Sequence, residues 1–192
     1  SWAGLADELQ RCEQLGLFAL IFHPGSNPDE AEGIRLVAEG MARALETAPG
    51  KVKLLTETTA GQGASLGHTF EQLAAIRDAI PAPLRRRTGI CVDTCHLFSA
   101  GYDLASEDGY QATWASLDRT LGLGLVHAFH LNDSKKALGS RVDRHEHIGE
   151  GTLGLSPFRR LVNDRRFARI PGFLETDLRY RENLSVLRSL IA

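Results

Sequence analysis

Segments of two kinds alternate along the whole chain: short apolar runs of strand length and longer amphipathic runs of helix length. The apolar runs cover residues 17–22, 52–55, 89–92, 125–129 and 173–174. The helical patterns cover residues 1–16, 28–48, 69–80, 106–121, 156–163 and 181–190. Because the short runs are apolar throughout, they are typical of parallel strands that are covered on both faces. The alternation therefore predicts an α/β protein with a parallel sheet.

Every predicted strand is followed by a residue type that binds metal ions. In chain order these residues are His23, Glu57, Asp93, His130 and Glu175. A single histidine or carboxylate at a strand end is more often a helix cap or a satisfied hydrogen-bonding group. In parallel β/α barrels, however, the carboxyl ends of the strands converge on one mouth, where catalytic groups collect. Mixed imidazole and carboxylate ligands suit zinc or manganese, so the pattern predicts a metal centre at this mouth.

A polar loop follows the strand that ends in His130 and extends to Gly151. Asp143 and His145 are two residues apart in this loop, so an extended backbone directs both side chains the same way. The strand-end residues together with His96, Asp143 and His145 are more ligands than one metal ion can bind. The sequence therefore predicts more than one ion. The alternative interpretation is a solvated polar loop without a ligand role.

Composition and charge exclude several classes of protein. The chain has 192 residues and a net charge of −2, so no excess of basic residues indicates nucleic-acid binding. It has neither the glycine-rich motif of dinucleotide-binding folds nor a phosphate-binding loop. Three cysteines without disulfide spacing indicate a reducing compartment, and no apolar stretch is long enough to span a membrane. We therefore expect a cytoplasmic protein without an obligate protein partner.

Six short motifs, in this order, strongly resemble those of the endonuclease IV family, the zinc-dependent apurinic/apyrimidinic endonucleases of base-excision repair. They lie at residues 22–26, 59–63, 93–96, 130–135, 139–145 and 149–151. The resemblance extends from Ser1 to about Thr176. It implies an eight-stranded β/α barrel with three zinc ions, manganese being an alternative in one position. The implied activity is hydrolysis of the phosphodiester 5′ to an abasic site in duplex DNA.

The resemblance also assigns roles to the candidate ligands. His23 and Glu57 match ligands of the first ion. Glu57 also matches the bridge to the second ion, whose other ligands correspond to Asp93, His130 and Glu175. The third ion would be bound by His96, Asp143 and His145. Glu57 and Glu175 are thereby implied as the catalytic residues.

Two features of the family have no counterpart in this sequence. The family's ninth ligand is a histidine on an earlier strand, and no histidine precedes His23. The first three strands of the family's barrel are absent as well. We therefore expect residues 1–192 to form one xylose isomerase-like barrel domain that lacks its N-terminal strands and has about five of eight. We also expect them to be the C-terminal part of a longer protein.

Basic residues fall into two groups by their place relative to the strands. Lys135, Arg141 and Arg144 follow a strand and are expected at the mouth, where they would contact DNA phosphates. Residues 85–87 and 165–166 are arginines that precede strands, so we expect them in solvated loops on the opposite face. Three further histidines match no ligand: we expect His68 at the surface, His127 packed within its strand, and His147 near the site without a ligand role.

Two other functions remain open from the residues alone. A metal-dependent sugar isomerase or epimerase on the same barrel also gathers histidines and carboxylates at strand ends, although with fewer ions. The other alternative is a truncated, non-catalytic remnant that folds poorly or binds DNA without cutting it.

Overall fold

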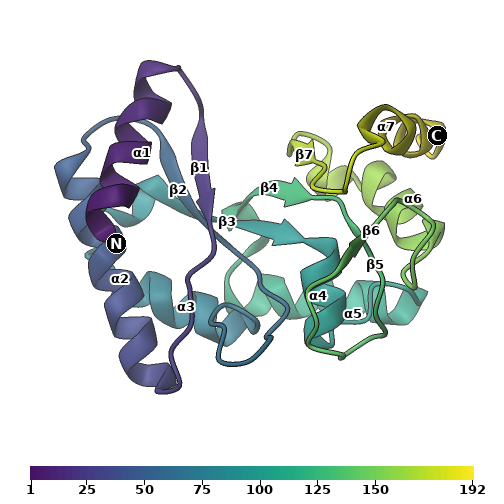
Figure 1. Ribbon diagram of the computed structural model, residues 1–192, viewed down its shortest axis with the longest axis horizontal. Coiled ribbons are helices and arrows are strands. Elements are labelled where there is room, and N and C mark those ends of the chain that lie inside the picture. The colour runs from purple at the N-terminus through teal and green to yellow at the C-terminus, as the bar shows by residue number, and fades with distance from the viewer.

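The computed structural model describes residues 1–192 and contains a five-stranded parallel sheet in the order β1-β2-β3-β4-β7 (Figure 1). The predicted α/β fold is confirmed: the strands form an open, partial TIM barrel. Each predicted apolar run contains a strand or overlaps one. The strands are β1 (Ala19–Phe22), β2 (Lys53–Glu57), β3 (Thr88–Asp93), β4 (Val126–His130) and β7 (Gly172–Phe173).

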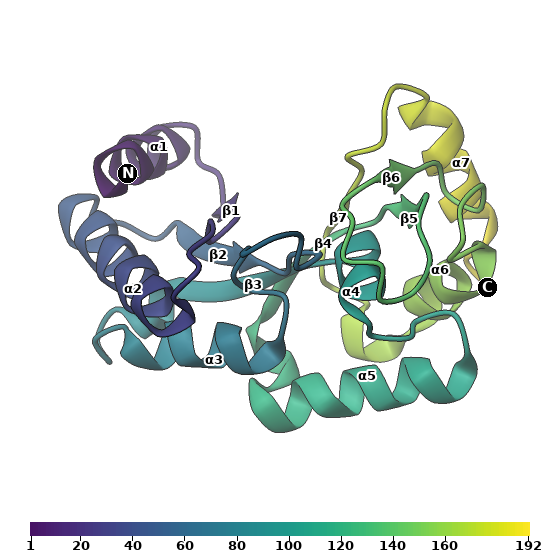
Figure 2. The ribbon, with the colours of Figure 1, turned by 60° about the horizontal axis from the view of Figure 1, so that its bottom comes forward.

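A helix connects each pair of consecutive strands of the sheet, and all the predicted helices are present. The helices are α1 (Trp2–Gln14), α2 (Glu30–Thr47), α3 (Phe70–Ala79), α5 (Glu107–Thr120), α6 (Leu155–Asn163) and α7 (Tyr180–Ser189). Polar N-caps begin several of them: the side chain of Ser106, for example, accepts a hydrogen bond from the Gly109 amide. Neighbouring helices pack in the series α1, α2, α3 and α5 along one side of the sheet (Figure 2).

Side chains alternate between the two faces of the sheet, so each strand contributes to two environments. On the helical face, Leu54 packs in a core with Met41 of α2, and Phe129 packs in a second core with Trp114 of α5. On the opposite face, a small apolar layer contains no helical residue. This inner layer consists of Leu55, Cys91 and Ala128.

Strand β4 contains a bulge at His127. Ile90 of β3 lies opposite Val126. The next residue, Cys91, lies opposite Ala128, so His127 has no partner in the ladder. An extra residue of this kind changes which face the following side chains occupy. Val126 accordingly belongs to the helical core, whereas Ala128 belongs to the inner layer.

Three short elements were not expected from the sequence. Helix α4 (Thr94–Ala100) begins directly after β3, with Asp93 as its N-cap. Strands β5 (Asp133–Ser134) and β6 (His145–Glu146) form an antiparallel hairpin within the long polar loop. The loop is therefore partly ordered by its own backbone pairing rather than being only a solvated connection.

Arg87 corrects the expectation that residues 85–87 lie in a solvated loop. Its guanidinium is buried and donates hydrogen bonds to the carbonyls of Leu45, Ala48 and Val52. The last carbonyls of a helix have no partner within the helix, and Arg87 supplies one at the end of α2. Arg86 is exposed, as expected.

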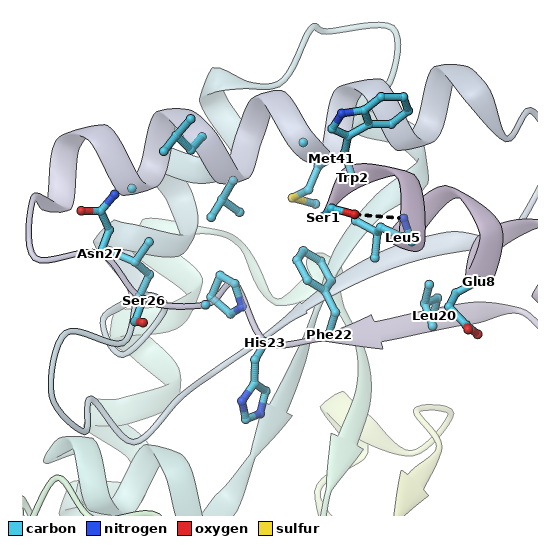
Figure 3. A pocket seen from close by; sticks show the side chains of 18 of the residues that line it. Ser1, Trp2, Leu5, Glu8, Leu20, Phe22, His23, Ser26, Asn27 and Met41 are labelled. Carbon is cyan, nitrogen blue, oxygen red and sulfur yellow. Dashed lines mark hydrogen bonds between the residues drawn. The ribbon is translucent and has the colours of Figure 1, made fainter.

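The two outer strands of the sheet, β1 and β7, each pair with only one neighbour. Beside β1, a groove of about 640 Å³ opens between this strand and helices α1 and α2 (Figure 3). Apolar side chains of Trp2, Leu20 and Phe22 line it. No helix in the structure combines the length and apolar character that crossing a membrane requires.

Candidate metal centre

Five of the eight candidate ligands lie at the carboxyl ends of the strands of the sheet. Three of them follow a member of the inner layer by two residues, which returns the side chain to the same face. These pairs are Leu55 and Glu57, Cys91 and Asp93, and Ala128 and His130. His23 directly follows β1, and its side chain points away from the groove that Phe22 enters (Figure 3).

Glu57 lies at the centre of the cluster and is almost fully buried. One of its oxygens, Oε2, is 3.2 Å from Nε2 of His23. The other, Oε1, is 2.7 Å from Nδ1 of His130 and 3.4 Å from Nδ1 of His96. Donor atoms of His23, Glu57 and His96 all lie within 4.8 Å of one another. One oxygen of the carboxylate thus faces His23, and the other faces His130 and His96.

A second group of donors surrounds the end of β4. Asp93 and His130 are direct partners in the β3–β4 ladder, so their side chains leave the sheet side by side. Oε2 of Glu175 is 2.9 Å from Nδ1 of His130. One donor atom from each of Glu57, Asp93, His130 and Glu175 lies within 4.8 Å of the others. These are the residues that the family resemblance assigns to the second ion.

A third group joins helix α4 to the polar loop. The Nε2 atoms of His96 and His145 are 3.3 Å apart. Oxygens of Asp143 lie 3.2 Å from the first and 3.4 Å from the second. Neighbouring donors around a tetrahedral zinc ion with bonds of about 2.1 Å are about 3.4 Å apart. The spacing of the two imidazoles therefore suits one ion. Two different oxygens of Asp143 make the contacts to them, and Asp93 lies within 4.8 Å of both imidazole donor atoms, so it is a further candidate ligand of this group.

The orientation of the His96 ring leaves one nitrogen free for a metal ion. Nδ1 lies 2.9 Å from the backbone oxygen of Thr58, a distance at which Nδ1–H donates to that carbonyl. Metal-binding histidines almost always donate their other ring N–H to such an acceptor, which fixes the tautomer. Nε2 of His96 then carries the lone pair, on the side that faces Asp143 and His145.

The electrostatics of the cluster favour positive charge at its centre. Burial would lower the pKa of His96, but the carboxylates around it, Asp93 foremost, raise that pKa to about 12. Burial would raise the pKa of Glu57, but hydrogen bonds with the three surrounding histidines lower it overall. The carboxylates thus require compensating cations, which protons on the imidazoles or divalent metal ions can supply.

The loop that carries Asp143 and His145 is organised by a buried carboxylate, Asp133. One oxygen accepts hydrogen bonds from two backbone N–H groups and the other from three. The five donors are the amides of Ser134, Gly149, Gly151, Leu153 and Gly154. Because β5 pairs with β6, the position of Asp133 also fixes that of His145.

The three basic residues expected to contact DNA are all exposed. Lys135 and Arg144 lie on the two sides of the hairpin, joined by a hydrogen bond from the Lys135 amide to the Arg144 carbonyl. Arg144 also lines a polar cavity of about 410 Å³ together with His23 and Asp143. Arg144 therefore lies beside the cluster, whereas Arg165 and Arg166 are exposed in the segment before β7.

The remaining histidines lie outside the cluster. His127 is half-buried against Gly89, and burial lowers its pKa. His147 lies near the site, with Nδ1 3.1 Å from the side-chain nitrogen of Asn183. His68 was expected at the surface but is half-buried, with Nδ1 2.9 Å from the carbonyl of Ser65.

Asn132 is a residue whose role the sequence did not reveal. It is completely buried and its side-chain amide contacts Asp93. The available signal was its place in the motif at residues 130–135, two positions beyond a strand-end histidine. That signal does not distinguish a residue supporting the ligands from an ordinary loop residue.

Comparison with known proteins identifies the family. Residues 1–190 match the family model described as the xylose isomerase-like TIM barrel. The chain is 51% identical to the probable endonuclease 4 of Chloroflexus aurantiacus, aligning over its whole length with 69% of that protein. It is 48% identical to the probable endonuclease 4 of Geobacter sulfurreducens, of which it covers 67%.

Solved structures agree with this result. Endonuclease IV from Thermus thermophilus superposes with a TM-score of 0.84 at 38% identity, covering 99% of this chain and 66% of that one. A D-tagatose 3-epimerase-like protein superposes with a TM-score of 0.67 at 20% identity, which shows a shared fold alone. This chain, which spans about two thirds of the length of these relatives, belongs to the endonuclease IV family.

Proposed function

We propose that this chain carries the zinc centre of an apurinic/apyrimidinic endonuclease, which hydrolyses the phosphodiester 5′ to an abasic site in duplex DNA. The observation that supports the proposal most directly is the convergence of three groups of metal-binding side chains around Glu57 and His96. The relatives described as probable endonuclease 4 support the reaction type.

The donor set fits zinc better than it fits magnesium or calcium. Four of the eight candidate ligands are histidines, and imidazole nitrogen suits zinc, whereas the other two ions prefer oxygen ligands. The ligands are drawn from the ends of all five strands of the sheet, from helix α4 and from the polar loop. The centre would therefore form only when the sheet and the loop are both folded.

Each side chain would contribute to hydrolysis in a distinct way. Bound zinc supplies a water of lowered pKa, about 7, and neutralises charge on the phosphate. Glu57 would bridge two ions, because its oxygens face His23 on one side and His130 on the other. The side chain of Glu175 is 43% exposed, so it would contact both the cluster and the entering phosphodiester. Lys135, Arg141 and Arg144 would bind neighbouring phosphates.

The test is strand cleavage of a duplex that contains one abasic site, using the protein as its gene encodes it. We expect one incision 5′ to the site, which is lost on treatment with a strong chelator and restored by added zinc. The same duplex with an intact base serves as the control substrate. A zinc-loaded protein that folds but leaves the abasic strand intact would refute the endonuclease activity.

A sugar isomerase or epimerase on the same fold is the second candidate, and the likeness to the epimerase-like structure supports only the shared fold. The group formed by His96, Asp143 and His145 distinguishes the two, since an isomerase would not need it as a third site. Measuring bound zinc per chain, with and without His145→Ala, tests whether this group binds an ion. A non-catalytic remnant would instead bind abasic DNA without cutting it.

A further inference from the structure

Asn132 connects two of the candidate ligands that come from strands at different positions in the sheet. Its side-chain nitrogen donates a hydrogen bond of 2.6 Å to Oδ2 of Asp93. Its side-chain oxygen accepts one of 2.9 Å from the backbone N–H of Glu175. Asp93 ends β3 and Glu175 follows β7, with β4 between them. One buried side-chain amide therefore bridges residues at the ends of two strands that lie on either side of β4.

The backbone of Asn132 is itself held in place from β3. Thr94 follows Asp93, and its hydroxyl donates a hydrogen bond of 2.7 Å to the carbonyl of Asn132. The same hydroxyl oxygen accepts a hydrogen bond of 3.0 Å from the Asn132 amide. Both residues are buried. The side chain of Asn132 thus projects from a backbone whose position is fixed relative to Asp93.

Glu175 has the greatest need of such a support. Strand β7 contains only Gly172 and Phe173, and its ladder with β4 ends there. Glu175 lies two residues beyond the ladder, so no strand pairing fixes its backbone. The hydrogen bond to Asn132 fixes it instead. Asp93 is held on both oxygens, because Oδ1 accepts from the His96 amide while Oδ2 accepts from Asn132.

We propose that Asn132 is a positioning residue that sets the distance between Asp93 and Glu175 as two ligands of one metal ion. This inference rests on the proposed zinc centre. An amide suits the task because it offers a donor to the carboxylate and an acceptor to the backbone N–H at the same time. Neither a carboxylate nor an apolar side chain of similar size provides both.

The experiment compares Asn132→Leu with the wild type in the protein as its gene encodes it. We expect the zinc affinity of one site to fall about 10- to 100-fold, as is usual when a residue that supports a metal ligand is lost. A chelator titration that monitors bound zinc per chain measures this. In abasic-strand cleavage, kcat should fall while KM stays near the wild-type value, and excess zinc should restore part of the lost kcat.

Gln72→Leu is the matched control. Gln72 is a buried amide on α3 that donates to Glu30 and accepts from the backbone N–H of Gly67, so its side chain has no hydrogen bond to a candidate ligand. Gln72→Leu therefore removes the same kinds of hydrogen bond as Asn132→Leu. It should lower stability while leaving zinc affinity unchanged. If Asn132→Leu does not fold, Asn132→Ala removes the same bonds without adding volume.

The outcomes separate the two proposals. A folded Asn132 variant that keeps wild-type zinc affinity would refute the positioning role while leaving the zinc centre intact. A wild-type protein that binds no zinc would refute the proposed centre and this inference together. Equal losses of zinc affinity in Asn132→Leu and Gln72→Leu would show that reduced stability, rather than ligand placement, is the cause.

Discussion

The two oxygens of Glu57 face different histidines, and the candidate centre depends on this division. We predict that Glu57→Gln, and likewise Glu175→Gln, lowers cleavage of abasic DNA more than about 100-fold, since loss of even a supporting residue costs about 10- to 100-fold. The fold should persist because both side chains lie beyond the hydrophobic cores. Single-turnover kinetics and circular dichroism test this, and near-normal turnover in either variant would contradict the assignment.

The exposed basic residues of the polar loop lead to a second prediction. Lys135→Ala and Arg141→Ala should weaken binding similarly for all DNA sequences, because phosphate contacts carry no sequence information. Each lost contact should reduce the slope of log K against log salt concentration by about 0.9. Arg165→Ala, an exposed arginine in the segment before β7, is the control. An unchanged slope in both test variants would remove these residues from the DNA-binding surface.

At the scale of residues, the sequence indicated the candidate ligands but not their support. His23 and Glu57 could be found because strand ends in a parallel sheet share one edge, so residue type and position were enough. The role of Asn132 could not be found from the sequence, because it depends on a hydrogen bond to a residue 39 positions away. Contacts between different strands depend on how the strands pack against one another, and the local pattern of residue types does not show this.

The end of helix α2 depends on an arginine that comes from a later segment. Arg87→Met should lower the free energy of unfolding by about 2 kcal/mol, because it leaves buried carbonyl groups without donors. Arg86→Met, at the exposed neighbouring position, should change it by less than about 0.5 kcal/mol. Urea unfolding of the two variants measures the difference. Equal losses would mean that Arg87 contributes only surface charge.

The polar loop should depend on Asp133 in a similar way. In Asp133→Asn, one side-chain oxygen is replaced by an amide that cannot accept hydrogen bonds from the backbone. We expect a loss of about 2 kcal/mol in unfolding free energy and faster amide exchange at Gly149 and Gly151. Hydrogen exchange measured by NMR reports both residues directly. Unchanged protection of these two amides would show that the loop is held by other contacts.

The long elements were predictable and the short ones were not. Helices α2 and α5 have amphipathic periodicity over several turns, which local sequence reveals. Helix α4 is only seven residues long and is buried along nearly its whole length, so it has no exposed face to produce a periodic pattern. Strands β5 and β6 contain two residues each, and their pairing depends on the loop that Asp133 organises.

The sheet as a whole is open at both edges. Strands β1 and β7 leave backbone N–H and C=O groups unpaired on their outer sides, and apolar grooves lie beside both. Exposed edges of this kind favour association. We predict that the 192-residue chain expressed by itself forms oligomers or aggregates, binds fewer than three zinc ions and cuts abasic DNA poorly.

Light scattering after size-exclusion chromatography, combined with zinc analysis, tests this prediction. The protein as its gene encodes it is the reference, measured at the same concentration. A monodisperse monomer of the 192-residue chain with three tightly bound zinc ions and full activity would contradict the prediction.

The bulge at His127 determines which face of the sheet the side chain of His130 occupies. Val126 points into the helical core. The unpaired His127 then shifts the alternation of the following side chains between the two faces by one residue. If His127 were paired regularly instead of bulging, the alternation from Val126 would turn His130 toward the helices and Phe129 toward the opposite face. Deletion of His127 alone would leave Ala128 opposite Cys91 and His130 opposite Asp93, whereas loss of a second residue from the strand would turn His130 toward the helices.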